Sequence, residues 1–116
     1  MRIVEIEKRT PILIKQLLKI WESSVRETHL FLSDNEIKRI ADYVPLALNN
    51  INHLVIVEDD NYQPVAFMGI EKERLEMLFV APHEIKKGLG KSLIQFGIKN
   101  YQLKELTVNE QNTQAK

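Results

Sequence analysis

A cluster of glycines and lysines stands between two apolar stretches of the chain. Its members are Lys86, Lys87, Gly88, Leu89, Gly90 and Lys91. The apolar run 75–80 before it and the helix-periodic residues after it predict a strand-to-helix turn. The first amides of a helix have no intrahelical acceptor, and glycine removes side chains that would block a ligand from them. The pattern therefore predicts an anion site, for which phosphate is the commonest occupant.

The lysines of this cluster support the same interpretation. A cation near a helix N-terminus is unfavourable by about 0.3–1 kcal/mol, and a polyanionic ligand would offset that cost at Lys86, Lys87 and Lys91. The alternative is a solvated loop with ordinary surface lysines. The turn by itself leaves both interpretations open.

Length and composition limit what the chain can be. Its 116 residues suit one small domain, residues 1–116, and 44% hydrophobic with 28% charged residues indicate a soluble globular protein. Sixteen basic and sixteen acidic residues cancel, so we expect no nucleic-acid partner and no membrane partner. The absence of cysteine excludes disulfides and thiolate chemistry. No signal peptide or membrane span is recognisable, and we expect a cytoplasmic protein.

The first half of the chain predicts one strand and two helices. Residues 1–7 alternate apolar and charged side chains, as a half-buried strand does. Thr10 and Pro11 predict the start of a helix that continues to Glu27. Ser33 and Glu36 have the spacing of a capping box, and Pro45 should end or kink the second helix near Tyr43.

The second half predicts three consecutive strands, a helix and a last strand. Their expected ranges are 53–58, 65–70, 74–80, 89–103 and 106–108. The fold class is therefore α+β, or mixed α/β, with an antiparallel meander and one βαβ parallel pair flanked by helices. Ligands favour the carboxyl ends of parallel strands, which is where the glycine turn falls.

Spacing separates the motifs that place glycines at such a turn. A nucleotide P-loop would need glycine at Ile85, four residues before Gly90. A dinucleotide fold would need a third glycine at Leu93 and a longer series of βαβ units than this chain can hold. Both fit poorly.

The turn resembles the signature of the GNAT N-acetyltransferases, which is Gln or Arg, two residues, Gly, one residue, then Gly or Ala. Lys86 to Ile94 is similar to it, and Pro82 and the strand ending Phe79-Val80 precede it as in the family. Ile85 departs from the expected Gln or Arg and weakens a side-chain contact. Residues 106–115 resemble the fifth strand and the Asn-led start of the next helix, and 28–32 resemble the inter-helix segment of small bacterial members. The resemblance covers essentially the whole chain.

This resemblance implies acetyl transfer from acetyl-CoA to a primary amine, by direct attack in a ternary complex. Pantetheine would pair with the strand ending at Val80, the amides from Lys87 to Ser92 would hold the pyrophosphate, and the N–H near Phe79 would stabilise the oxyanion. The implied cofactor-binding residues are Leu78, Phe79, Val80, Lys86, Lys87, Gly88, Leu89, Gly90, Lys91, Ser92 and Asn112.

Three side chains are candidates for the acceptor side. Glu76 lies on the strand beside the expected thioester, where it could act as base or orient the amine, or simply face solvent. His29 lines the expected acceptor pocket, or packs or caps a helix end, whereas Phe31 is part of the core or of the pocket wall. We expect structural or exposed roles for His53 and His83, and the scattered histidines predict no metal site.

The chain ends where family members continue with a helix and a strand hairpin. The resemblance therefore predicts a cofactor half-site with little or no transferase activity, and an unprotected sheet edge at Leu106 prone to homodimerisation. The alternative function is a non-catalytic acyl-CoA-binding or interaction module on the same scaffold.

Overall fold

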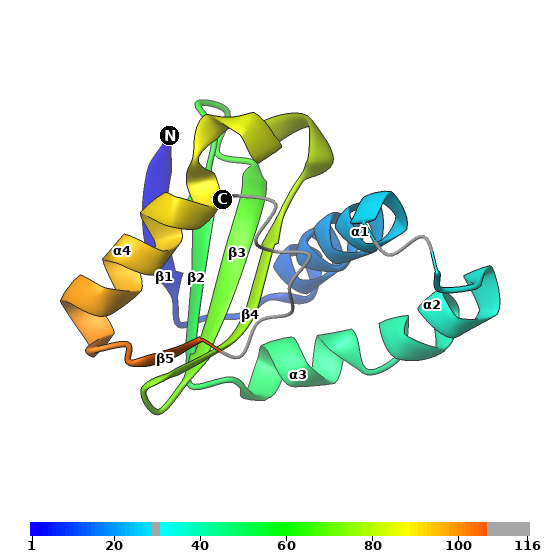
Figure 1. The fold of residues 1–116 in the computed structure, drawn as a ribbon, viewed down its shortest axis with the longest axis horizontal. Coiled ribbons are helices and arrows are strands. Elements are labelled where there is room, and N and C mark those ends of the chain that lie inside the picture. The colour runs from blue at the N-terminus through cyan, green and yellow to red at the C-terminus, as the bar shows by residue number, and fades with distance from the viewer. Residues whose placement is uncertain (29–30, 107–116) are drawn as a thin grey trace.

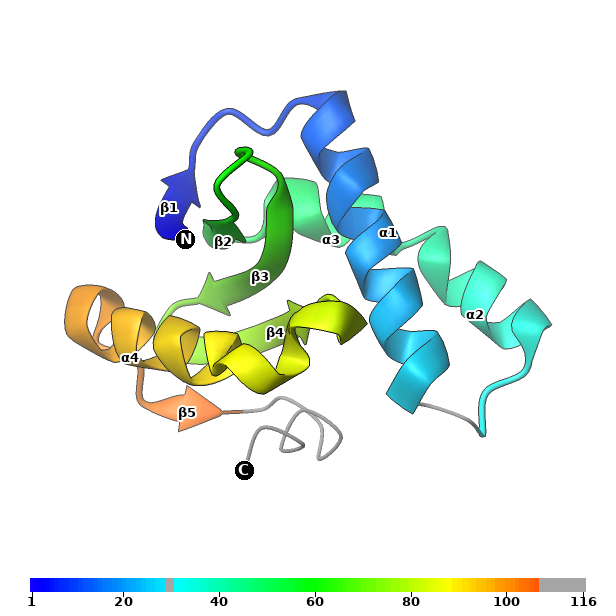
Figure 2. The ribbon, with the colours of Figure 1, turned by 90° about the horizontal axis from the view of Figure 1, so that it is seen from above.

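The fold is a layered α+β structure, in which a sheet lies between α4 on one face and α1 to α3 on the other (Figures 1 and 2). The computed structural model describes residues 1–28 and 31–106, without the side chains of 86, 105 and 106. The elements are β1 (Arg2–Ile6), α1 (Pro11–Thr28), α2 (Asp34–Ala41), α3 (Val44–Asn50), β2 (His53–Glu58), β3 (Pro64–Glu71), β4 (Arg74–Val80), the 3-10 helix η1 (Pro82–Lys87), α4 (Leu89–Tyr101) and β5 (Glu105–Leu106).

The helices of the first half begin where their capping residues predict. The Leu13 amide donates to Thr10 Oγ1 over 3.2 Å, and Pro11 occupies the first position of α1. At α2, the Ser33 side chain accepts from the Glu36 amide and the Glu36 carboxylate accepts from the Ser33 amide. The predicted capping box is confirmed.

The second helix ends shortly before Pro45, as predicted. Helix α2 ends at Ala41, and α3 starts at Val44 with Pro45 in its first turn. A proline there removes an N–H that would have no helical partner in any case. Arg9 ties the end of α3 to the start of the chain, because its guanidinium donates to the carbonyls of Leu48 and Asn52 over 2.8 and 3.2 Å.

The sheet has the strand order β1-β2-β3-β4-β5, and β1 to β4 are antiparallel neighbours. The α+β class and the antiparallel meander are confirmed. In β5, Glu105 and Leu106 lie beside Arg74 and Leu75 in parallel register. The other predicted residues of this strand, Thr107 and Val108, lie outside the described residues, so the full βαβ pair stays a prediction.

Apolar side chains cover both faces of the central strands. Leu54, Ile56 and Phe67 pack under α1 and α3, whereas Val55, Met68 and Leu75 pack under α4. All six are at most 1% exposed, so each strand reads as a continuous apolar run and not as an alternating one. The two cores hold α4 and α1 against opposite faces of the sheet.

A β-bulge interrupts β4 at Glu76. Gly69 of β3 pairs with Met77, but the next pair is Ile70 with Leu75, so Glu76 has no partner across the ladder. Gly69 is needed there, since a Cβ would lie 2.7 Å from Met77 Cγ. The two residues of β4 that pair with β5 precede this bulge.

Candidate functional site

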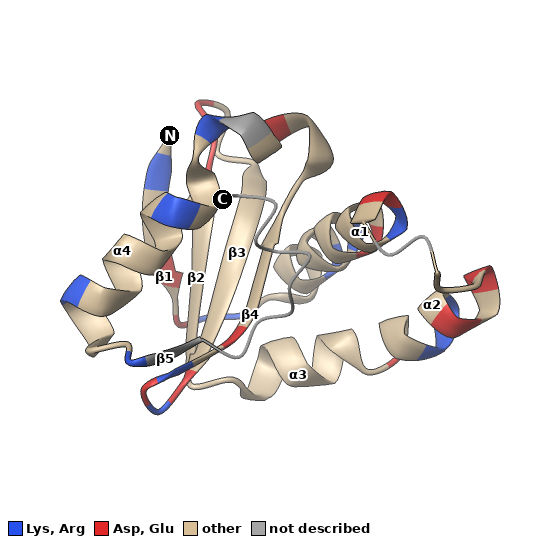
Figure 3. Cartoon of the chain, in the orientation of Figure 1, with Lys and Arg blue, Asp and Glu red and all other residues tan. Residues whose placement is uncertain are grey.

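The glycine turn joins η1 to α4 at the end of β4. Gly88 has φ 71° and ψ 22°, a left-handed conformation that favours glycine, and it is the residue directly before α4. Among the described residues, a Cβ added to Gly88 would meet no heavy atom within 4 Å apart from its own chain neighbours. Figure 3 shows basic segments at the start of this helix.

The first amides of α4 follow directly after Gly88. An α-helix bonds each N–H to the carbonyl four residues earlier, so the amides of Leu89, Gly90 and Lys91 have no acceptor within α4. The Ser92 amide donates to the Gly88 carbonyl over 3.0 Å. This corrects one predicted contact, because the Ser92 N–H is already bonded inside the helix.

The lysines of the turn differ from one another. Lys87 lies 2.8 Å from Glu84 Oε1, so its ammonium is directed back along the turn. Lys91 is exposed, and no ion pair to it occurs among the described residues. The side chain of Lys86 lies outside the described part of the structure. Of the two lysines of this turn whose side chains the structure describes, Lys91 is therefore the one whose charge is available to a ligand.

The backbone of β4 presents a different amide from the one predicted. The Ala81 N–H donates to the Val65 carbonyl over 2.9 Å, and hydrogen-bonded pairs alternate along an antiparallel ladder. The pair of Phe79 with Phe67 lies two residues before the pair of Ala81 with Val65, so it is also a hydrogen-bonded pair. The N–H of Phe79 therefore points to β3. The Phe79 amide is thus used within the sheet and is not free to bond an oxyanion. The amides of Leu78 and Val80 point to the other side, where β5 pairs with the start of the strand.

The side chain of Phe79 belongs to the core. Its ring lies 5.6 Å from that of Phe67, on the face covered by α1. Leu78 is buried on the opposite face, under α4. These contacts fix the path of β4 toward the glycine turn.

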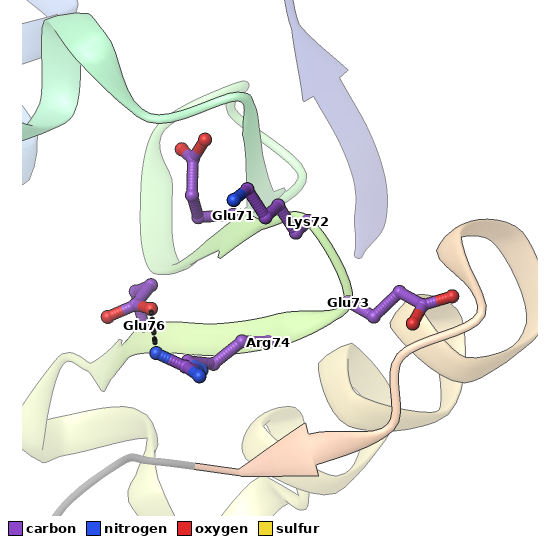
Figure 4. A pocket seen from close by; sticks show the side chains of 5 residues that line it. All are labelled: Glu71, Lys72, Glu73, Arg74 and Glu76. Atoms are coloured by element: carbon purple, nitrogen blue, oxygen red, sulfur yellow. Dashed lines mark ion pairs between the residues drawn. The ribbon is translucent and has the colours of Figure 1, made fainter.

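Glu76 is an exposed carboxylate on the bulge, 3.8 Å from Arg74 Nη1. It contributes to a cavity of about 340 Å³ at the β3–β4 turn, whose lining residues are Glu71, Lys72, Glu73, Arg74 and Glu76 (Figure 4). Three carboxylates and two cations give this cavity a net negative charge. An amine that entered it would approach β4 two residues from Leu78.

The other predicted residues do not join these groups. Phe31 is 79% exposed, which excludes a core role and leaves the predicted pocket role untested. His29 and Asn112 lie outside the described residues. His83 is exposed beside Glu84, 3.3 Å from Oε2, as expected of a loop residue.

Two clusters of polar side chains were not predicted from the sequence. Glu5, His53 and Tyr101 join β1, β2 and the end of α4, since the Glu5 carboxylate accepts from Tyr101 Oη and bonds His53 Nδ1 over 2.9 Å. Burial raises the pKa of Glu5, but these hydrogen bonds outweigh it and leave the pKa below its ordinary value. Burial, together with the Glu5 carboxylate, raises the pKa of Tyr101. No local spacing signals this cluster, because the partners are far apart in the chain.

The second cluster consists of Glu84, His83 and Lys87. The i,i+3 spacing of Glu84 and Lys87 is the sequence feature that could have predicted their ion pair. Within residues 1–28 and 31–106, no group of three or more His, Asp or Glu side chains could hold a metal ion. Over the same residues, no helix is both long and apolar enough to cross a bilayer.

Comparison with known proteins assigns the family. A family model described as an acetyltransferase (GNAT) domain matches residues 17–116. The chain is 34% identical over 105 residues to peptidyl-lysine N-acetyltransferase YjaB of Salmonella typhimurium, covering 87% of this chain and 69% of that protein.

Solved structures agree with this assignment. The solution structure of apo YjaB from Escherichia coli superposes with a TM-score of 0.79 at 32% identity, covering 99% of this chain and 77% of that one. An aminoglycoside 6'-N-acetyltransferase complexed with coenzyme A has the same fold, with a TM-score of 0.63 at 21% identity over 88% of this chain and 56% of that one. This chain therefore belongs to the GNAT family of acetyl-CoA-dependent N-acetyltransferases.

Proposed function

We propose that acetyl-CoA lies along the second half of β4, with its pyrophosphate at the start of α4. The observation that carries this proposal is the left-handed Gly88, which joins η1 to α4 and has no described heavy atom outside its chain neighbours within 4 Å of the position of a Cβ. The amides of Leu89, Gly90 and Lys91 would bond the phosphate oxygens, as helix N-termini commonly do. Lys86, Lys91 and the predicted Asn112 would add contacts from their side chains.

The pantetheine arm would pair with the backbone of β4. Leu78 and Val80 support this placement, because their amides point away from β3. Pantetheine would lie along this side of β4, in the part of the strand that follows the bulge at Glu76. The Leu78 N–H, nearer the bulge, would then stabilise the oxyanion in place of Phe79.

The chemical step joins an amine nitrogen to the acetyl carbonyl carbon and breaks the carbon–sulfur bond. The amine must lose a proton, and the departing thiolate of CoA must gain one. Glu76 would accept the proton from the amine, directly or through water, since its exposed carboxylate lies two residues from Leu78. Holding the two reactants in this geometry supplies much of the acceleration.

The acceptor would be a primary amine. The net negative cavity beside Glu76 favours an ammonium group, and the names of relatives include peptidyl-lysine and aminoglycoside N-acetyltransferases. Lysine side chains of proteins are the class we favour, on the closer identity to the YjaB proteins. His29 and Phe31 would border the same pocket, and the enzyme would act in the cytoplasm as a single domain that can pair through its C-terminal sheet edge.

Calorimetric titration with CoA, followed by a thiol-release assay with acetyl-CoA and a panel of amines, tests this function. We expect Gly88→Glu to abolish CoA binding, because it places a carboxylate in the anion site. Lys99→Gln, an exposed lysine at the other end of α4, is the matched control and should bind normally. Undiminished CoA affinity in Gly88→Glu would show that the site is misplaced.

A further inference from the structure

Glu84 is a buried carboxylate in the turn that leads into the proposed pyrophosphate site. It lies on η1, which packs against both α1 and α4. It is 8% exposed, and among the described residues it is the one charged side chain in the buried class. Burying a carboxylate is costly unless positive groups or hydrogen bonds compensate it. The groups around the Glu84 carboxylate must therefore supply this compensation.

Two basic side chains of the same turn lie on this carboxylate. Lys87 Nζ is 2.8 Å from Oε1, although outside the angles of a hydrogen bond, and His83 Nε2 is 3.3 Å from Oε2. The Lys87 and His83 side chains are 56% and 71% exposed, so the carboxylate is inside and its partners face solvent. Glu84 thus fixes the direction of Lys87.

The position of Lys87 makes this pair relevant to cofactor binding. Lys87 directly precedes Gly88, so its ammonium is within the turn that would receive the pyrophosphate. While it is paired with Glu84, its charge is neutralised, and the carboxylate adds a negative charge next to an anion site. Lys91, for which the described residues offer no ion pair, is left to attract the phosphates.

We propose that Glu84 is a positioning residue that restrains Lys87 and thereby limits the affinity of the turn for CoA. This inference rests on the proposed function. An acetyltransferase must release CoA after each transfer, and a turn that withholds one cation from the pyrophosphate releases it faster.

Glu84→Gln tests the proposal, because it keeps the shape of the side chain and removes its charge. We expect the Kd for CoA, measured by calorimetry, to fall three- to tenfold, and KM for acetyl-CoA to fall while KM for the amine stays constant. Glu58→Gln is the matched control, since Glu58 is 17% exposed and paired with Arg2 over 2.6 Å at the far edge of the sheet. It should leave the Kd for CoA unchanged.

Lys87 supplies the second arm of the test. In the wild-type background Lys87→Gln should change the Kd less than twofold, and in the Glu84→Gln background it should remove the gain. A Glu84→Gln variant that binds CoA no more tightly than the wild type overturns the proposal. A more than fivefold loss of affinity for CoA in Lys87→Gln alone also overturns the proposal. This measurement does not require a Glu84 variant to fold.

Failure of this inference is distinguishable from failure of the site. If Gly88→Glu and Lys91→Gln both weaken CoA binding while Glu84→Gln does not strengthen it, the site stands and the role of Glu84 is refuted. If neither weakens CoA binding, the pyrophosphate lies elsewhere and both proposals fall.

Discussion

Replacing Gly88 with alanine tests the conformation on which the cofactor site depends. At φ 71° and ψ 22°, a residue with a Cβ is strained by roughly 1–2 kcal/mol. The added Cβ would meet no heavy atom within 4 Å, so no steric clash adds to that cost. We therefore expect Gly88→Ala to lower the free energy of unfolding by about 1–2 kcal/mol.

Gly88→Asn separates backbone strain from other effects of the substitution. Asparagine adopts the left-handed region more readily than alanine, because its short polar side chain bonds locally. We expect its loss of stability to be smaller than that of Gly88→Ala. Urea unfolding followed by circular dichroism measures both variants, and the alanine variant should also melt several degrees below the wild type.

The same strain should appear in cofactor affinity. Without CoA, the turn of the alanine variant can relax out of the left-handed conformation, and CoA binding must then restore it. If restoring the turn costs about 1.4 kcal/mol, the affinity for CoA becomes tenfold weaker. The order of affinity should be glycine, asparagine, alanine. An alanine variant as stable as the wild type, or an asparagine variant as unstable as the alanine one, would refute the reasoning.

Three further substitutions test the framework around the site. Ser33→Ala removes the side-chain cap of α2 and should cost about 1 kcal/mol of unfolding free energy in urea titrations. Tyr101→Phe removes the hydroxyl bond to Glu5 and should cost about 1 kcal/mol in the same assay. Because the folded-state pKa of Glu5 lies below its ordinary 4.5, its carboxylate adds stability above that pH and loses it as pH falls through the lower folded pKa. The stability difference between wild type and Glu5→Gln should therefore vanish in acid.

Each of these predictions has a matched control. Ser23→Ala lies on the exposed side of α1, and Tyr43 is 67% exposed, so Ser23→Ala and Tyr43→Phe should leave stability within about 0.5 kcal/mol of the wild type. Glu7→Gln retains Glu5 and its hydrogen bonds, so the stability of this variant should still fall in acid. A Ser33→Ala or Tyr101→Phe variant no less stable than its control would contradict the assigned bond. A Glu5→Gln deficit that persists in acid would show that the carboxylate charge is not its cause.

Local signals predicted much of the fold. Thr10-Pro11, the Ser33 capping box and Pro45 each act within a few residues, so the sequence places the helix ends they define. The glycine turn is local too, and glycine at Gly88 permits the left-handed geometry found there. These features need no knowledge of what lies across the sheet.

Features that depend on distant partners were not predictable in the same way. The outward amides belong to Leu78 and Val80 because of the pairing between Val65 and Ala81, which no single strand encodes. The bulge at Glu76 is defined by the pairing of β4 with β3, where Gly69 lies opposite Met77. The pair of Glu84 and Lys87 needed evidence of burial, because an i,i+3 spacing alone is common on solvated surfaces.

The strand order has a consequence for how the chain folds. Strands β2, β3 and β4 follow one another through short turns, so their pairing closes small loops and can form early. Strand β1 pairs with β2 only after three helices intervene, as the contact of Ile6 with Leu54 shows. We therefore infer that the β4 backbone is shaped in the folding nucleus, and that the edge strand β1 docks late. Substitutions in β1 should mainly accelerate unfolding, whereas substitutions in the meander should slow folding.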